Sequence, residues 1–513
     1  MNLAIVDQHP YGIKPYANIL FASLDKQQKR HQGLGLLGCF KDDILLEILY
    51  YISSHDLINM ILSSTTLYMY CHYTDLWRDL TLREWENDNS NGINYIATWK
   101  DTYISNYCHA NNKILPNRFP HIPIKFDGLY SDLLFRTWSC HSCDLERTLP
   151  GFMKNNDINH IDCNDLSIDN FINHYEKLNK PVVIRNGISD WPALKKWTSE
   201  YLAEVSGDYR FRATSATAPI AASFTMKEYF TYSSSAREEA PLYLFERDFS
   251  NVEAIKNDYH VPKYFHKDNS SNEYATDLFR ILGEKERPDH KWLISGPARS
   301  GSIFHIDPNQ TNAWNAAIVG RKKWIFYPPH ISPPGVISSE DGADVTVPLS
   351  IGEWLLAFWH LHLEARKHPD ISSRPLETIL HPGDVIFVPH GYWHMVVNLD
   401  DCIALTHNYV STSNLADCLR FLREKPDQIS GVRDRPDEAI DADNMYEVFL
   451  SKLREMGTLD KTIIENIVDE SFKRSSNKEQ IMKKKMNTNN NNNSNNSTTS
   501  EIQHNNFNFN FQF

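Results

Sequence analysis

The sequence lacks any run of about 18 consecutive apolar residues, the length at which a membrane-spanning helix is expected. It also begins without the charged and then apolar pattern of a secretory signal peptide. Cysteine is scarce, with 8 in 513 residues, which is too few for a disulfide framework in a chain of this length. These absences predict a protein of a reducing intracellular compartment that makes no use of a membrane.

Positive charge is in deficit as well, because the formal net charge is −13 at pH 7. A broad surface for polyphosphates is therefore not indicated, and neither is direct binding of nucleic acid. An acidic enzyme is electrostatically compatible with a basic protein or peptide substrate, such as a histone tail or a segment rich in Arg and Lys. The apolar content of 41% is sufficient for a packed core, and the length predicts more than one domain.

Residues that carry chemistry gather at two places in the second half of the chain. His305 and Asp307 stand two positions apart, so both side chains can project from one face of a strand, and His394 comes from a distant strand. Two imidazoles and one carboxylate on one side of a metal form the facial triad of non-haem Fe(II) oxygenases. The spacing alone also permits two structural histidines and a turn aspartate.

Short apolar segments separated by Gly and Pro turns surround these residues. We expect strands at 292–295, 314–319, 322–327, 384–388 and 393–399, and we expect the last two to form a hairpin. This pattern predicts an all-β jelly-roll, which is a cupin-like double-stranded β-helix, with helices around it.

Two segments resemble the JmjC (jumonji) Fe(II)- and 2-oxoglutarate-dependent oxygenases. They read SGSIFHIDPNQTNAWNAAIVGRKKWIFYPP and LHPGDVIFVPHGYWHMVVNLDDCIALTHNYVS. Within the family they look most like the subgroup of the nuclear lysyl hydroxylase and arginine demethylase once described as a phosphatidylserine receptor. The likeness extends upstream and covers about residues 170–410.

The resemblance implies roles for particular residues. His305, Asp307 and His394 would bind Fe(II) at the catalytic centre. The dianion 2-oxoglutarate needs a cation and hydrogen-bond donors, because burying an unpaired carboxylate is costly. The resemblance assigns Lys322 to this task, whereas strand periodicity alone leaves open whether Lys322 or Lys323 faces the site. The other co-substrate residues that it implies are Thr406, Tyr243, Asn315, Ser302 and Asn408. For the last three, a polar side chain that caps its own turn is the alternative.

The implied function is that of a 2-oxoglutarate-dependent dioxygenase that hydroxylates a protein side chain. The outcome is either lysyl hydroxylation or demethylation of histone arginine or lysine, and the sequence does not choose between them. Two alternatives stay open. One is a substrate receptor of a ubiquitin ligase whose barrel is not catalytic, and the other is a metal-binding cupin with different chemistry, such as an isomerase.

The N-terminal third carries a second resemblance. Apolar residues at helical spacing at 40–49, 57–62 and 75–80 look like an F-box, the three-helix module that docks to the Skp-type adaptor of cullin-RING ubiquitin ligases. The usual Leu-Pro at its start is replaced by Phe40-Lys41. The alternative is a helical bundle that only supports the barrel.

The expected organisation follows from these patterns. It is an N-terminal segment (1–37), an F-box-like module (38–88), a connecting region (89–165), a JmjC catalytic domain (166–425, barrel core about 290–412), C-terminal helices (426–474) and a disordered Asn-rich tail (475–513). The resemblance makes a homodimer through the C-terminal helices plausible.

Three shorter motifs bear on localisation and on further metal sites. The basic clusters Lys473-Arg474 and 483–485 have the spacing of a two-part nuclear import signal, so we expect the nucleus, with the cytoplasm as the alternative. The only CxxC, at Cys140 and Cys143, lacks a second pair, and the histidines at 360, 362 and 368 lack a partner at ligand spacing. We predict no metal site at either place.

Overall fold

The computed structural model describes residues 9–85, 93, 95–114, 124–215, 218–265, 277–432, 440–457 and 459–475. Most of the expected tail, 476–513, and the basic cluster at 483–485 lie outside the described residues. No helix in the described ranges is long and apolar enough to cross a membrane.

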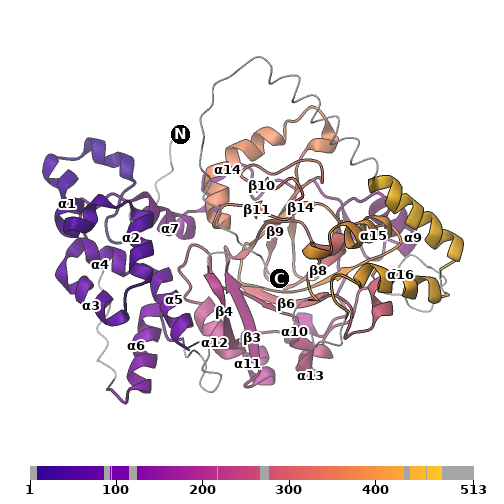
Figure 1. Cartoon of the computed structure of the whole chain (residues 1–513), viewed down its shortest axis with the longest axis horizontal. Coiled ribbons are helices and arrows are strands. Elements are labelled where there is room, and N and C mark those ends of the chain that lie inside the picture. The colour runs from indigo at the N-terminus through magenta and orange to yellow at the C-terminus, as the bar shows by residue number, and fades with distance from the viewer. Residues whose placement is uncertain are drawn as a thin grey trace.

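Helices form the N-terminal part of the molecule, at the left of Figure 1. They are η1 (Tyr16–Phe21), α1 (Leu24–Leu34), η2 (Gly35–Cys39), α2 (Asp42–Tyr50), α3 (Ser54–Ser63), α4 (Thr65–Cys71), α5 (Thr74–Trp85), α6 (Trp99–Ala110), α7 (Asp132–Ser142) and α8 (Leu145–Thr148). The three expected helices correspond to α2, α3 and α5. Helix α4 was not expected, and it begins after Ser64, whose side chain accepts from the Leu67 N–H as an N-cap.

Two antiparallel sheets make the jelly-roll that the strand pattern predicts, and this fold class is confirmed. The strands are β1 (His160–Asp162), β2 (Val182–Arg185), β3 (Arg210–Ser215), β4 (Ala218–Thr225), β5 (Tyr243–Glu246), β6 (Lys291–Gly296), β7 (Gly301–His305), β8 (Asn312–Val319), β9 (Lys322–Tyr327), β10 (Ile337–Ser338), β11 (Val345–Thr346), β12 (Leu376–Leu380), β13 (Val385–Val388), β14 (Trp393–Asn398) and β15 (Cys402–Tyr409). The larger sheet has the order β1-β2-β13-β8-β15-β6-β5-β3-β4, with only β1 and β2 parallel, and the smaller has the order β12-β9-β14-β7.

The expected hairpin of 384–388 and 393–399 is wrong. Strand β13 pairs with β8 and β2 in the larger sheet, whereas β14 pairs with β9 and β7 in the smaller one. The chain passes from one sheet to the other at the turn of residues 389–392, as it also does between β8 and β9. In a jelly-roll, successive strands alternate between the two sheets, so a short turn does not imply pairing.

Further helices surround the barrel, and the last of them follow it at the C-terminal end of the described chain. They are α9 (Ile168–Phe171), η3 (Ile172–Glu176, a π-helix), α10 (Ala193–Lys196), α11 (Ser199–Ser206), α12 (Met226–Ser233), η4 (Phe249–Asn251), α13 (Glu253–Lys256), η5 (Leu278–Leu282), η6 (Pro308–Gln310), α14 (Ile351–Ala365), η7 (Ile371–Ser373), α15 (Leu415–Glu424), η8 (Pro426–Gln428) and α16 (Met445–Glu455), with one more at 461–475. The apolar faces of η5, α15, α16 and the last helix share one cluster.

A single hydrophobic cluster links the N-terminal helices to the larger sheet. It contains Leu76 and Trp77 of α5, Trp99 of α6, and Leu244 and Leu405 of the sheet, all buried. The N-terminal helices therefore pack on the barrel as part of one core, although the segment boundaries expected from the sequence stay predictions.

Candidate metal centre and co-substrate pocket

One pocket between the two sheets collects all nine residues that the sequence singled out. The larger sheet contributes Tyr243, Asn315, Thr406 and Asn408, the smaller sheet contributes Ser302, His305, Lys322 and His394, and Asp307 follows β7. Alternation of side chains explains the pattern, because residues two apart on a strand face the same side. Thr406 and Asn408 on β15 are one such pair.

Strand β7 departs from this alternation, since Ser302 and His305 are three positions apart and both line the pocket. The register explains it: His305 pairs with His394, Ser302 pairs with Val396, and the pairing shifts between them. Two residues of β7 therefore stand opposite one residue of β14, as in a β-bulge, which turns both polar side chains inward. Gly301 starts the strand at φ +144°, and a Cβ there would meet the Val396 carbonyl oxygen at 2.0 Å.

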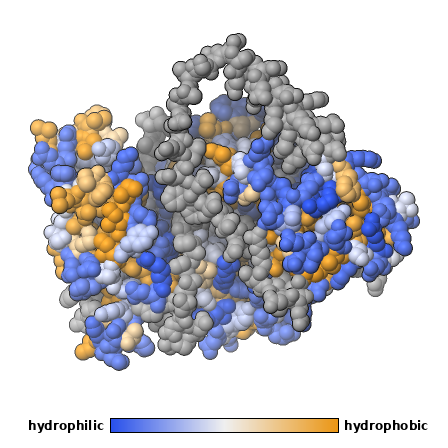
Figure 2. All heavy atoms as spheres, viewed as in Figure 1, coloured by the Kyte–Doolittle hydropathy of each residue, from blue (hydrophilic) through white to orange (hydrophobic). Residues whose placement is uncertain are grey.

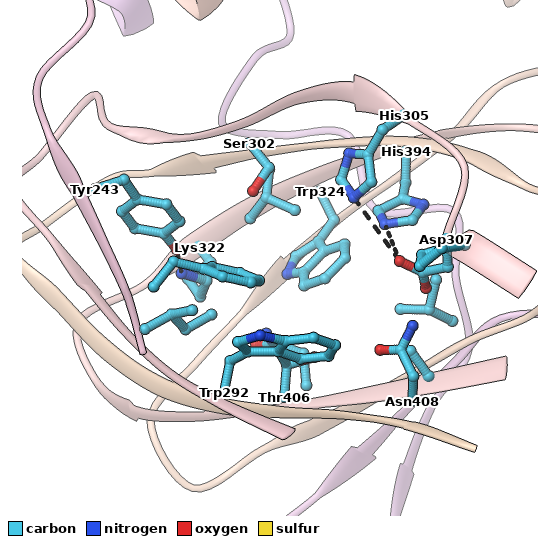
Figure 3. Close-up of a pocket in the computed structure, with 17 residues that line it drawn as sticks. Tyr243, Trp292, Ser302, His305, Asp307, Lys322, Trp324, His394, Thr406 and Asn408 are labelled. Carbon is cyan, nitrogen blue, oxygen red and sulfur yellow. Dashed lines mark hydrogen bonds and ion pairs between the residues drawn. The ribbon is translucent and has the colours of Figure 1, made fainter. Parts of the chain in front are cut away.

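His305, Asp307 and His394 form a compact set of ligand atoms, all within 4.8 Å of one another. The Nε2 atoms of His305 and His394 lie 3.8 and 3.7 Å from Asp307 Oδ1 (Figure 3). The Nδ1–H of His305 donates to the Ile303 carbonyl at 2.8 Å, and that of His394 donates to the Tyr392 carbonyl at 3.1 Å. Each ring thus keeps the lone pair of Nε2 toward the carboxylate, which is the arrangement of a metal-binding histidine.

The protonation of these three groups fits a cation as well. Burial lowers the pKa of His305 and of His394 to about 4, so both imidazoles are neutral at neutral pH. Burial raises the pKa of Asp307 to about 6. A cation between the three side chains favours the carboxylate and lowers this pKa again. Two neutral imidazoles and a carboxylate with open positions suit Fe(II).

Lys322 lies at the other end of the pocket in Figure 3. Its side chain is 1% exposed, and its Nζ donates to Tyr243 OH at 3.0 Å and to Asn398 Oδ1 at 2.7 Å. Neither partner carries a negative charge, and no ion pair of Lys322 with a carboxylate occurs among the described residues. A buried cation without an anion is unfavourable, so this end of the pocket is suited to a carboxylate ligand.

Lys323 points away from the pocket, as alternation requires, but it is not solvated. Its side chain is 0% exposed and its Nζ lies 2.9 Å from Glu377 Oε2 on the far face of the smaller sheet. Lys323 therefore already has a carboxylate, and Lys322 has none within the part of the chain that the structure describes. This difference, which periodicity alone left open, makes Lys322 the lysine of the pocket.

Two buried polar atoms that line the pocket have no partner within the described chain, namely Asn315 Oδ1 and Trp324 Nε1. Trp324 lies between Lys322 and the histidines in Figure 3. Thr406 Oγ1 donates to the Trp314 carbonyl, and Asn408 Nδ2 donates to Thr311 Oγ1. The free donor and acceptor indicate a polar ligand between the two ends, because buried polar groups are rarely left unsatisfied.

Sequence reasoning missed a polar residue and three aromatic residues of this site, besides smaller apolar ones. Asn398 holds Lys322, and Trp292, Phe245 and Trp324 line the pocket. Alternation could have found Asn398, since it stands four positions after His394 on β14 and so shares its face. The aromatic residues carried no such signal, because Trp and Phe in strands most often belong to the core.

The other candidate clusters are structural. His362 is 0% exposed, contacts Tyr327 OH through Nδ1 and donates from Nε2 to Glu377. Cys140 and Cys143 are both buried, and burial raises the pKa of the Cys140 thiol far above its usual value. Within the described residues, His305, Asp307 and His394 are the only group of three or more side chains that could hold a metal ion.

Comparison with known proteins agrees with this geometry. The model of the cupin-like domain matches residues 168–414. The arginine-specific demethylase JMJ22 of Arabidopsis thaliana is 37% identical over 449 residues, which are 87% of this chain and 81% of JMJ22. The bifunctional arginine demethylase and lysyl-hydroxylase psr-1 of Caenorhabditis elegans is 31% identical over 59% of this chain and 72% of psr-1.

A more distant relative is named for both cofactors. The 2-oxoglutarate and iron-dependent oxygenase JMJD4 of Mus musculus is 26% identical over 292 residues, 51% of this chain and 62% of JMJD4. The His-Asp-His cluster, the unpaired Lys322 and the extent of similarity to JMJ22 point to one conclusion. The chain belongs to the JmjC family of cupin-type oxygenases that depend on iron and 2-oxoglutarate.

Proposed function

We propose that this protein hydroxylates an arginine or lysine side chain of a basic protein substrate, with Fe(II) held by His305, Asp307 and His394. Hydroxylation of an N-methyl carbon gives a hemiaminal that releases formaldehyde and so removes the methyl group, whereas hydroxylation of a lysine side-chain carbon leaves a stable hydroxyl. Both outcomes appear among the relatives, because JMJ22 is named an arginine-specific demethylase and psr-1 a bifunctional arginine demethylase and lysyl-hydroxylase. The observation that carries the proposal is the buried, unpaired Lys322 facing the His-Asp-His cluster across one pocket.

The residues of the pocket have different roles in this proposal. Fe(II) and 2-oxoglutarate, when bound, supply the oxidation of a C–H bond by O₂. Lys322 pairs with the distal carboxylate of 2-oxoglutarate, and Tyr243 holds the ammonium group in place. We assign the unpartnered Trp324 Nε1 and Asn315 Oδ1 to polar contacts in the middle of the pocket, with Ser302, Thr406 and Asn408 around them. Trp292 and Phe245 exclude water from the opposite wall.

Turnover of 2-oxoglutarate to succinate tests the reaction class. Purified full-length protein with Fe(II) and O₂ is expected to form succinate, and His305→Ala and Lys322→Ala are expected to lose this activity. His360→Ala and Lys195→Ala are matched controls, because both side chains are exposed and lie outside the pocket. A wild-type protein that binds neither Fe(II) nor 2-oxoglutarate under anaerobic titration would refute the proposal. Full activity of Lys322→Ala would refute the role of Lys322 in binding 2-oxoglutarate, and absence of succinate from a wild type that binds a metal would support a cupin of other chemistry.

Intact-mass spectrometry of peptides identifies the outcome. Unmethylated and methylated histone-tail peptides and an Arg/Lys-rich peptide are incubated with the active protein and with His305→Ala. A gain of one oxygen on an unmethylated lysine marks a hydroxylase, and loss of methyl groups from arginine or lysine marks a demethylase. If succinate forms and every basic peptide stays unchanged, the substrate class proposed here is wrong.

A second candidate function concerns the N-terminal helices, for which we propose docking to a Skp-type adaptor. The supporting observation is a group of exposed apolar side chains on these helices, the part of the molecule that shows several orange areas at the left of Figure 2. The group comprises Leu36, Phe40, Ile44, Tyr51, Ile58 and Leu62, and three of these, Leu36, Tyr51 and Leu62, are at least 80% exposed. Exposed apolar patches of this kind mark interaction sites.

Co-purification with the adaptor tests this docking. Tyr51→Asp together with Leu62→Asp is expected to abolish the complex and to leave succinate formation intact. Ile337→Asp and Ile371→Asp, which change exposed apolar residues elsewhere, serve as controls. Absence of a complex with the wild type would leave the N-terminal helices as a support of the barrel only.

We further propose nuclear import through Lys473-Arg474 and the cluster at 483–485, and a homodimer through the C-terminal helices. A fluorescent fusion with Lys483, Lys484 and Lys485 changed to Ala is expected to stay in the cytoplasm, whereas the wild type enters the nucleus. Light scattering measures the oligomeric state, and a monomer at micromolar concentration contradicts the dimer.

A further inference from the structure

Helix α7 lies between the start of the described chain and the barrel. The backbone N–H of Tyr16 donates to the Asp132 carboxylate in its first turn at 2.7 Å, and the rings of His9 and Trp138 lie 5.2 Å apart. On its other side, α7 contacts α14 and two loops of the barrel. One of these loops leads to Tyr243 and the other is hydrogen-bonded to Asn398, the two residues that accept from Lys322.

The first loop carries Glu239, whose side chain is almost fully buried. Arg136 of α7 lies 3.4 Å from this carboxylate, and Thr137 Oγ1 donates to it at 3.3 Å. Ser350, the N-cap of α14, donates to it at 2.8 Å. Four residues later the chain reaches Tyr243, the first residue of β5. The segment that leads into β5 is therefore attached to α7 by hydrogen bonds and by an ion pair whose carboxylate is buried.

The second loop carries Arg299, a non-glycine residue at φ +74°. Its guanidinium donates to the carbonyl oxygens of Cys140, at 3.3 Å, and of Cys143, at the C-terminal end of α7. Cations are favourable there, because the last carbonyls of a helix have no partner within it. The left-handed backbone is unfavourable for a side chain, so the contacts of Arg299 must hold it.

The same turn holds Asn398 by three hydrogen bonds. The backbone N–H of Arg299 donates to the Asn398 carbonyl at 2.7 Å, and the Asn398 N–H donates to the Ser300 carbonyl at 2.8 Å. Asn398 Nδ2 donates to Ser300 Oγ at 2.9 Å, which orients Oδ1 toward Lys322 Nζ. Both groups that accept from Lys322, Tyr243 OH and Asn398 Oδ1, thus belong to segments anchored on α7.

We infer that Arg299 and Glu239 are positioning residues for the co-substrate: they hold Asn398 and Tyr243, and through them the ammonium group of Lys322, against helix α7. This inference rests on the proposed function, because it takes the distal carboxylate of 2-oxoglutarate as the ligand of Lys322. The fixed cation binds that carboxylate without first losing conformational freedom. Helix α7 then sets the affinity for one end of the co-substrate and not for the metal.

Binding of two 2-oxo acids tests the inference. Full-length protein with Fe(II) and without O₂ is titrated with 2-oxoglutarate and with 2-oxopentanoate, which has the same length but no distal carboxylate. Arg299→Gly removes the guanidinium and keeps a residue that tolerates φ +74°. We expect this variant to bind 2-oxoglutarate about tenfold more weakly. Its affinities for 2-oxopentanoate and Fe(II) should be unchanged.

Glu239→Gln is the second variant, since it keeps the shape of the side chain and removes its charge, and the same selective loss is expected. Arg454→Ala removes an exposed arginine that pairs with Glu465 and serves as the control.

Two results would overturn the inference. Equally weakened binding of both acids would show general damage to the fold, and unchanged binding of 2-oxoglutarate would show that Arg299 and Glu239 do not position Lys322. A wild type that binds 2-oxopentanoate and 2-oxoglutarate equally well refutes the carboxylate role of Lys322. A wild type that binds neither acid refutes the proposed function.

Discussion

At the scale of single residues, a hydrogen bond at each histidine ring decides which nitrogen is available to a metal. The carbonyl oxygens of Ile303 and Tyr392 only accept, so Nδ1 of His305 and of His394 must carry the proton. Both carbonyls belong to the residue two positions before the histidine. The ligand geometry is therefore built from local backbone and does not depend on a distant side chain.

Glu176 shows what burial does to a carboxyl that forms no ion pair within the described residues. It lies in the π-helix η3 with its side chain almost fully buried, and Tyr409 OH donates to it at 2.8 Å. Burial raises the pKa of Glu176 from 4.5 to about 7. The folded protein therefore keeps the proton between these pH values while the unfolded chain loses it. Stability contributed by Glu176 falls as the pH rises from about 4.5 to 7 and is constant above that range.

Glu176→Gln should flatten this part of the stability profile, because glutamine stays neutral at every pH. Relative to the wild type, the variant should gain on the order of 3 kcal/mol in free energy of unfolding between pH 4.5 and pH 8. Urea unfolding at these two pH values measures the difference, with the exposed Glu253→Gln as the control. Parallel profiles for wild type and Glu176→Gln would contradict the assignment.

The sequence indicated the three side chains of the candidate metal site, which the structure brings together, better than it indicated the residues that hold the pocket in place. His305, Asp307 and His394 were found because a triad needs particular residue types at a particular spacing. Asn398 and Arg299 were not, because an amide and an arginine in turns have many uses and only the fold shows which one applies. Periodicity placed Lys322 and Lys323 on opposite faces of the strand but did not show that Lys323 is buried in an ion pair. Its partner Glu377 lies on β12, and the sequence gives no sign that the two strands pair.

At the scale of elements, the positions of the five expected strands followed from composition, whereas their pairing did not. Strand β9 begins and ends as predicted, and β14 differs by one residue. The hairpin of β13 and β14 was wrong because turn residues report that the chain reverses and not which sheet receives it. The sequence did not predict the bulge in β7 either, since the bulge depends on the register in which β7 pairs with β14.

A buried network fixes α14 on the outer face of the smaller sheet. Glu377 of β12 contacts Lys323 of β9 at 2.9 Å and His362 of α14 at 3.1 Å, and all three side chains are 0% exposed. Burial alone would raise the pKa of Glu377, but the hydrogen bond from His362 and the charge of Lys323 together lower it to about 2. The carboxylate is thus charged at neutral pH and neutralises Lys323 within the core.

Glu377→Gln should lower the free energy of unfolding by about 3–5 kcal/mol, because it leaves the Lys323 charge buried without its partner. The double variant Lys323→Met with Glu377→Gln should recover much of this loss, since the amide still accepts from His362 and no charge remains unpaired. Urea unfolding at pH 7 measures both. A double variant less stable than Glu377→Gln would mean that Lys323 stabilises the fold by contacts other than this pair.

At the scale of the whole molecule, the N-terminal helices and the barrel share one core. Trp99 of α6 is 1% exposed and packs against Tyr232 of α12, with the ring centroids 5.6 Å apart. Its Nε1 donates to Glu238, the neighbour of Glu239. The sequence suggested separable modules because their patterns differ, F-box-like helices and then strands. The sequence patterns indicate the secondary structure of each part, but they do not indicate how the two parts pack against each other.

Trp99→Ala should therefore destabilise the molecule as a unit. Loss of the buried ring and of the partner of Glu238 should lower the free energy of unfolding by about 3–5 kcal/mol. Hydrogen exchange followed by mass spectrometry reports the N-terminal helices and the barrel through separate peptides, and on heating both should lose protection together in a single transition. Tyr51→Ala, in the same helical part but 80% exposed, should have little effect. If the helices lost protection at lower temperature while the barrel kept its transition, the N-terminal helices would be an independent domain. In that case a change in the N-terminal helices could not affect the position of Lys322 through helix α7. Such coupling requires that the N-terminal helices and the pocket belong to one cooperative structure.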